Sequence, residues 1–230
     1  REGAVRLAGR EEVLEKVTAD FRFDETRVTL DSLKGRQGSE GRVRAVGALE
    51  LKGLSVQSYR FDLALRDFTA SEAGLYAAQI GGDFVITNGP RVRGAILPQV
   101  TGQVSLRRAA VLFDFANQSE TQQLAASTQP LFWTYRVKVD ASRNLHWQPA
   151  DGDLEFSADL TLEQTPDSLL IYGDLHGERG TYYFLSNRFN VTRADLTFDN
   201  ESGVNPQLDI EAVARGIPTQ EPNDLGSGSE

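Results

Sequence analysis

Side chains that catalyse reactions or bind metals are few and scattered in this sequence. It contains no Cys and only two His, His146 and His176, which lie far apart. The lack of Cys excludes thiolate metal ligands, Cys nucleophiles and disulfides. His176 alternates with Leu175, so we expect it on the outward face of a strand. We therefore interpret both His as surface or groove-edge residues, not as metal ligands or catalytic bases.

Acidic residues are more frequent, but their spacing is typical of a solvated surface. Asp151, Asp153 and Glu155 resemble the start of a calcium loop, yet the glycine and the distal Glu of that loop are not in register. Glu155, Asp159 and Glu163 alternate with apolar residues, so they share one charged face and do not form a glycosidase-like pair. Nucleotide-binding and hydrolase fingerprints do not occur. We predict no enzyme activity, no catalytic residue, no metal site and no cofactor.

Composition restricts the partners and the setting. The 230 residues suffice for one large β domain or two small ones. A formal net charge of −9 argues against a nucleic-acid partner, which would need a basic surface. The sequence starts at Arg1 and lacks Met, so we expect a piece of a longer protein. No apolar stretch approaches the roughly 18 residues that a membrane helix needs, and no signal peptide is visible.

Strict alternation of apolar and polar residues predicts half-buried strands along most of the chain. The clearest case runs from Leu154 to Leu162, where Glu155, Ser157 and Asp159 separate the apolar residues. Turn residues separate such runs at intervals of about ten residues, which is typical of a sandwich, a barrel or an extended sheet. The residues expected on the apolar face are Phe21, Phe23, Leu49, Leu51, Phe61, Leu63, Leu65, Phe113, Phe115, Val137, Val139, Leu154, Phe156, Leu160, Leu162, Leu169, Ile171, Leu175, Tyr182, Phe184, Phe189, Val191, Leu196, Phe198, Leu208 and Ile210.

The chain divides into two alternating parts, residues 1–116 and 132–215, joined by a polar loop over 117–131 that we expect to be flexible. The tail 216–230 is rich in Pro, Gly and Ser, which predicts disorder. Two local assignments are less clear. Residues 10–17 fit either a short helix or the lead into a strand, and Asn88-Gly89-Pro90 suggests a turn.

A sheet with one apolar and one charged face must cover its apolar face, either with a second sheet or with a ligand. A closed sandwich is one solution. An elongated, curved, all-β sheet forming an open hydrophobic groove is the other.

The order of features from Tyr135 to Ala214 favours the groove. It includes Gly180-Thr181-Tyr182-Tyr183-Phe184, then Phe189 and Val191, then Leu196 and Phe198, and finally Asn205-Pro206-Gln207-Leu208-Asp209-Ile210. This region resembles the C-terminal domain of the TamB family, the inner-membrane-anchored subunit of the translocation and assembly module. Leu185-Ser186 and Ala194 depart from the small or glycine residues common in that family.

The resemblance implies a taco-like β-groove in the periplasm of a Gram-negative-type envelope. It also implies an inner-membrane anchor, an N-terminal helix outside this sequence, and a BamA-type outer-membrane barrel (TamA-like) reached through a missing C-terminal segment. The family has no catalytic set. Its two attached roles are moving phospholipid between the membranes and assisting insertion of outer-membrane proteins.

Three functions therefore remain open. The first is a lipid conduit, in which phospholipid acyl chains slide along a uniform apolar lining. The second is a chaperone-like surface that binds unfolded outer-membrane proteins by strand addition. The third is an ordinary closed β-sandwich binding module.

Overall fold

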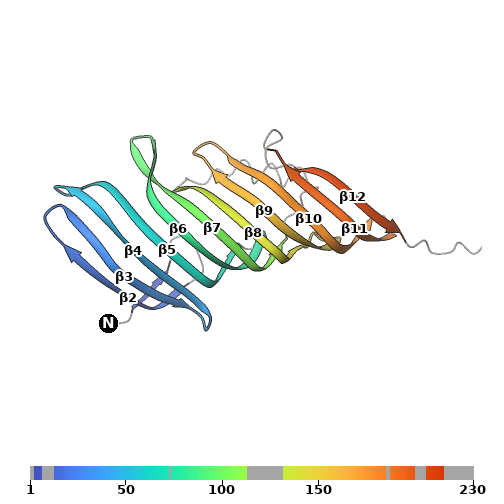
Figure 1. Ribbon diagram of the computed structural model, residues 1–230, viewed down its shortest axis with the longest axis horizontal. Coiled ribbons are helices and arrows are strands. Elements are labelled where there is room, and N and C mark those ends of the chain that lie inside the picture. Colours follow the sequence, from blue (N-terminus) through green and yellow to red (C-terminus); the bar gives the residue numbers. More distant parts are fainter. Residues whose placement is uncertain are drawn as a thin grey trace, which may run out of the picture.

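The computed structural model describes residues 3–6, 13–72, 74–112, 132–184, 187–199 and 206–214, which form one open sheet of 12 strands in sequence order (Figure 1). The strands are β1 (Gly3–Arg6), β2 (Val13–Phe23), β3 (Arg27–Gln37), β4 (Gly41–Lys52), β5 (Ser55–Glu72), β6 (Tyr76–Val92), β7 (Ala95–Val111), β8 (Thr134–Trp147), β9 (Gly152–Gln164), β10 (Leu169–Phe184), β11 (Asn187–Phe198) and β12 (Gln207–Ala214). The prediction of an all-β, elongated, curved sheet is confirmed. Among the described residues, no helix is long and apolar enough to span a bilayer.

All neighbouring strands pair antiparallel except β7 and β8, which are parallel. Gln99 pairs with Thr134 and Val111 with Trp147, so both strands start at the same edge of the sheet. Antiparallel neighbours need only a hairpin, whereas a parallel pair needs a long connection. The parallel pair therefore divides the sheet into two runs of hairpins, β1–β7 and β8–β12.

Three local predictions need correction. Val13–Val17 belongs to β2, so the helical alternative is wrong over these residues. Asn88-Gly89-Pro90 lies inside β6, and the turn follows at Arg93-Gly94, where both residues have positive φ. That geometry matches a type I′ hairpin. Leu169–Phe184, which sequence patterning splits at Gly177, is one strand with a bulge.

Bulges bend most strands near their middle, and from β5 onward they lie side by side across the sheet. The pairing shifts between Leu65 and Phe68, between Ser105 and Ala109, and between Gly177 and Arg179; further shifts follow Gln79, Ala141 and Val191. An extra residue in one strand bends that strand and increases its twist. We call this line of bulges the crease; it curves the sheet around its apolar face.

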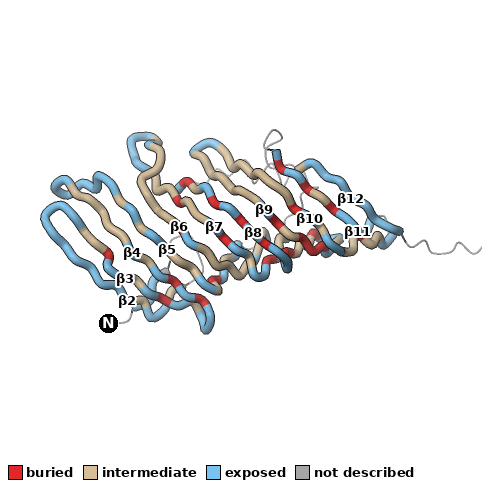
Figure 2. The backbone as a smooth tube through the Cα atoms, viewed as in Figure 1, coloured by how far each residue is buried: buried red, intermediate tan, exposed pale blue. Residues whose placement is uncertain are grey.

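Apolar side chains pack in two clusters on that face. One, mainly over β5–β9, centres on Phe84, Val100 and Val137. The other, mainly over β7–β11, contains Leu154, Phe156, Ala194 and Leu196. Figure 2 shows buried residues concentrated in β7–β11 and largely exposed residues at both ends of the sheet.

Candidate functional site: the apolar face of the sheet

Cross-strand pairing aligns the apolar residues in rows that run perpendicular to the strands. Phe61 pairs with Ile86, Ile86 with Val100, and Val100 with Tyr135. A parallel row joins Leu63, Phe84, Gly102, Val137, Leu162 and Ile171. Directly opposite side chains on one face touch one another, so these rows make a continuous apolar strip across six strands, β5 to β10.

Glycines in this strip make room for large neighbours. A Cβ at Gly47 would lie 2.4 Å from a ring carbon of Phe61, and one at Gly82 would lie 3.0 Å from the ring of Phe84. Gly173 has φ 105°, and a Cβ there would lie 2.2 Å from the carbonyl oxygen of Asp159. Glycine in a strand often marks such a close approach of a neighbouring ring or backbone. The missing side chains at these glycines therefore leave space in which the neighbouring rings and backbone pack closely as the strip curves.

The predicted lining residues occupy three different environments. Those that the structure buries are Val137, Val139, Leu154, Phe156, Leu175, Val191, Leu196 and Phe198. Those that are half-buried are Leu49, Leu51, Phe61, Leu63, Leu65, Leu160, Leu162, Leu169, Ile171, Tyr182 and Phe189. Those that are exposed are Phe21, Phe23, Phe184, Leu208 and Ile210. Phe113 and Phe115 lie outside the described residues.

The apolar face is therefore not uniform, contrary to the expectation from sequence. Phe156 is 1% exposed and Ala194 is 0% exposed, so the part over β8–β11 is packed like a protein interior. Phe23, at the other end, is 73% exposed. Between them, β4 and β5 present half-buried side chains such as Leu49, Phe61 and Leu63, whereas Phe84 and Val100 of β6 and β7 are buried.

Sequence reasoning missed several residues of the same face, including Phe68, Phe84, Val100 and Val104, all buried. Phe68 breaks the alternation because the bulge after Leu65 shifts the strand by one residue. Phe84 does alternate with Gly82 and Ile86, but no strand was predicted over these residues. The alternation around Phe84 was therefore the usable signal.

The opposite face carries charged side chains that neutralise one another across strands. Arg66 contacts Asp83 at 3.0 Å and Lys138 contacts Asp159 at 3.2 Å. Arg179 Nε donates to Glu155 at 2.7 Å, and this hydrogen bond lowers the pKa of that carboxyl. These pairs fit the predicted solvated face.

Both His lie on this charged face, His176 being exposed and His146 partly so, each with an aspartate as partner. His146 Nδ1 lies 2.9 Å from Asp153, and His176 Nδ1 lies 2.9 Å from Asp195. The hydrogen bonds from His176 and from Arg193 lower the pKa of the Asp195 carboxyl. Across the described residues, no group of three potential ligands is arranged to hold a metal ion.

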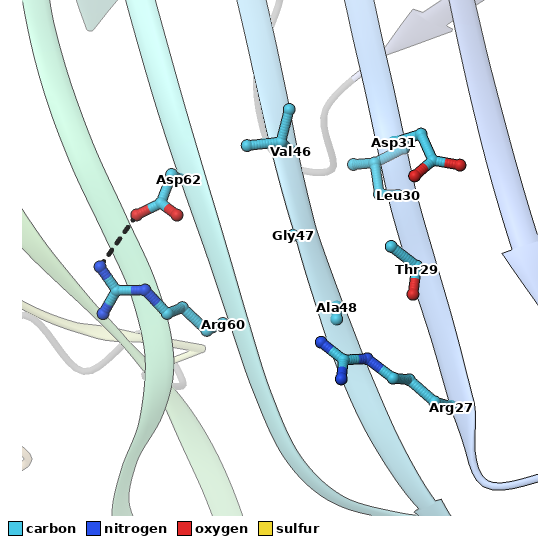
Figure 3. Close-up of a pocket in the computed structure, with 9 residues that line it drawn as sticks. All are labelled: Arg27, Thr29, Leu30, Asp31, Val46, Gly47, Ala48, Arg60 and Asp62. Atoms are coloured by element: carbon cyan, nitrogen blue, oxygen red, sulfur yellow. Dashed lines mark hydrogen bonds and ion pairs between the residues drawn. The ribbon is translucent and has the colours of Figure 1, made fainter.

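One shallow hollow of about 380 Å³ opens on the charged face between Arg27 and Arg60 (Figure 3). Its floor is formed by Val46, Gly47 and Ala48 of β4. The two guanidinium groups are already paired, Arg60 with Asp62 at 3.0 Å and Arg27 with Glu50 at 3.5 Å. The hollow therefore offers no strong unpaired charge to a ligand, and the apolar face remains the better candidate site.

Comparison with known protein families assigns the chain. The TamB C-terminal domain matches residues 31–224, which is most of the chain. No curated protein and no solved structure gives a significant match. The TamB family is a transport and assembly module of the Gram-negative envelope and is not known to contain enzymes. The sequence match and the open, curved, 12-stranded sheet agree, and the chain belongs to the TamB family.

Proposed function

We propose that the curved apolar face is a groove in the periplasm that conducts phospholipid between the inner and outer membranes and so supports outer-membrane biogenesis. One observation carries this proposal: the sheet stays open while its apolar rows cross many strands, from exposed Phe21 in β2 to exposed Ile210 in β12. A monomeric protein rarely exposes so extended an apolar surface without a ligand or partner for it.

The energetics favour acyl chains as the ligand. Strands lie about 4.8 Å apart, so 12 of them span a trough of roughly 60 Å. Each methylene buried contributes roughly 0.8 kcal/mol. Head groups can remain in water at the open side of the trough, which avoids the cost of burying their charges.

We expect an acyl chain to enter the groove over the half-buried side chains of β4 and β5. Leu49, Phe61 and Leu63 lie there on adjacent strands, with Gly47 making room for Phe61. By contrast, the tightly packed cluster around Phe156 has to loosen before a chain passes β8–β11.

Neighbouring residues of β4 supply the test. Leu49→Asp places a charge on the apolar face, whereas Ala48→Asp places the same charge on the opposite face, beside Arg60. We expect phospholipid that co-purifies with the protein to fall several-fold in Leu49→Asp and to stay unchanged in Ala48→Asp, as measured by mass spectrometry of extracted lipid. Equal lipid content in the two folded variants would contradict the proposal.

The free edge of β12 favours a second function, chaperone-like binding of unfolded outer-membrane protein strands. This strand has exposed Leu208 and Ile210 and pairs only with β11 among the described strands. Strand addition to such an edge would satisfy its free backbone groups. Hydrogen exchange of the β12 amides should slow when a peptide copy of an outer-membrane strand is added, and unchanged exchange would exclude this function.

The family's wider arrangement is part of the same proposal. A BamA-type barrel would be the outer-membrane partner, contacted by chain beyond β12, and an inner-membrane anchor would precede β1.

A further inference from the structure

Exposed apolar side chains are gathered along one long edge of the sheet, which we call the apolar rim. It comprises Phe23, Leu54, Ile96, Phe132 and Trp133. They lie at the end of β2, in the β4–β5 turn, at the start of β7 and just before β8, which all fall on the same edge (Figure 1). Leu54 is fully exposed, Phe132 is 76% exposed and Trp133 is 48% exposed.

Tight hairpin turns place Leu54 and Ile96 at or next to the ends of the β4–β5 and β6–β7 hairpins. Lys52 pairs with Ser55, which leaves a two-residue loop of Gly53 and Leu54 with positive φ at Gly53. Glycine at that position matches a type II′ turn, whose second residue is usually polar at a surface. The β6–β7 hairpin rises above its neighbours in Figure 1 and ends in Arg93-Gly94, next to Ile96. Arg93 has φ 48°, a conformation that non-glycine residues rarely adopt.

Cations accompany two of the apolar tips, Leu54 and Ile96, although the whole chain has a net charge of −9 and the turn after Phe23 is acidic, with Asp24 and Glu25. Lys52 precedes the Gly53-Leu54 loop, and Arg91 and Arg93 lie beside Ile96. In the part of the chain that the structure describes, neither Lys52 nor Arg93 forms an ion pair. The described turns of the opposite edge, 38–40, 74–75 and 148–151, contain no Lys or Arg, although exposed Leu112, Phe184 and Val213 also lie near that edge.

From this combination we propose that the apolar rim docks on a phospholipid bilayer. Leu54, Ile96, Phe132 and Trp133 enter the boundary between head groups and acyl chains, and Lys52, Arg91 and Arg93 contact the lipid phosphates. Aromatic and aliphatic tips flanked by cations suit this interface, which is wet on one side and apolar on the other. The inference concerns the edge of the sheet and does not depend on lipid passing along the groove.

Trp133 provides a direct readout, because the chain contains two Trp in total and the other, Trp147, packs against Phe156. Trp147→Phe leaves Trp133 as the single fluorophore. Vesicles of phosphatidylethanolamine with a quarter of phosphatidylglycerol should shift its emission to the blue, and vesicles with brominated acyl chains should quench it. High salt should weaken the effect because surface charges are then screened. Emission that does not change on adding vesicles would overturn the proposal.

Vesicle flotation tests which residues are responsible. The double variant Leu54→Asp, Ile96→Asp should float roughly tenfold less protein, since two apolar side chains no longer leave water. Val213→Asp is the control, because Val213 is also exposed, lies at the opposite edge of the sheet and is not one of the groove residues. It should float like the unaltered chain.

Two outcomes would overturn the proposal. One is a double variant that floats as well as the control. The other is a pair of results: the apolar rim cross-links to a protein, and vesicles bind the unaltered chain no better than they bind the double variant. That pair would show that the partner of the apolar rim is a protein and not a bilayer. Since Leu54 lies in a turn outside the groove, the single variant Leu54→Asp should keep its co-purified lipid. Failure of the rim and failure of the groove are therefore distinguishable.

Discussion

Gly173 occupies a position where a side chain meets backbone on the neighbouring strand. Its φ is 105°, and a Cβ would lie 2.2 Å from the Asp159 carbonyl oxygen. Gly173→Ala should lower the free energy of unfolding by about 2–4 kcal/mol, because the clash and the unfavourable φ add. Urea unfolding followed by circular dichroism measures this.

Gly81→Ala is the control, since a Cβ at Gly81 would have Ser105 Oγ as its nearest side-chain atom, 3.6 Å away. That substitution should change the free energy of unfolding by less than about 1 kcal/mol. If both variants are equally stable, close approach at Gly173 is not what shapes the strip.

Phe156 shows how unevenly single residues contribute to stability. It is 1% exposed and packs beside Trp147, whereas Phe21 is half-exposed near the other end of the sheet. Phe156→Ala should cost about 3–5 kcal/mol, as for other buried aromatic residues. Phe21→Ala should cost less than about 1 kcal/mol. Similar losses in urea unfolding would show that the apolar face is covered evenly after all.

Single strands were predictable as far as alternation continued without interruption. Leu154–Leu162 is strictly alternating, and β9 has the predicted inward and outward residues. Asp67 and Asn144 were not predictable as strand residues with positive φ, because nothing in their neighbours requires φ 50° and 63°. Such bulges depend on pairing with strands distant in sequence, which alternation does not encode.

The crease is the element on which the curvature depends. In β10 the extra residue is Glu178, since Gly177 pairs with Phe156 and Arg179 with Glu155. Deleting Glu178 keeps Arg179 and Gly180 paired with Glu155 and Leu154 of β9, but it leaves β10 one residue short opposite β11, where Gly177 pairs with Ala194 and Gly180 with Val191. We expect the pairing of β10 with β11 to loosen, seen as faster hydrogen exchange of the amides of β11 and β12.

Deleting Ser39 from the turn between β3 and β4 is the comparison, because it shortens a surface turn and leaves the strand register intact. It should preserve slow exchange throughout the sheet. Unchanged slow exchange in β11 and β12 after deletion of Glu178 would mean that the crease does not set the register between β10 and β11.

The whole molecule is organised like a one-dimensional array, in which each strand chiefly contacts its sequence neighbours. Alternation was sufficient to predict strands with one apolar face, and the resemblance to the TamB family was needed to favour an open sheet over a closed sandwich. The sequence was not sufficient to predict that β7 pairs with β8 in parallel. The alternating apolar residues around Val100 and Val137 would form the same strip whether the two strands ran parallel or antiparallel. Nor did the sequence predict that burial peaks around Phe156 and fades towards Phe23, because burial depends on curvature and not on residue type.

We propose that lipid lies against the apolar face of the sheet and not against its charged face. A photo-cross-linking residue in place of Phe61 faces the apolar strip, and one in place of Arg60 faces away from it on the same strand. Illumination in cells, followed by mass spectrometry, should give phospholipid adducts at position 61 and few at position 60. Equal adducts at both positions, or protein adducts alone at position 61, would contradict the account.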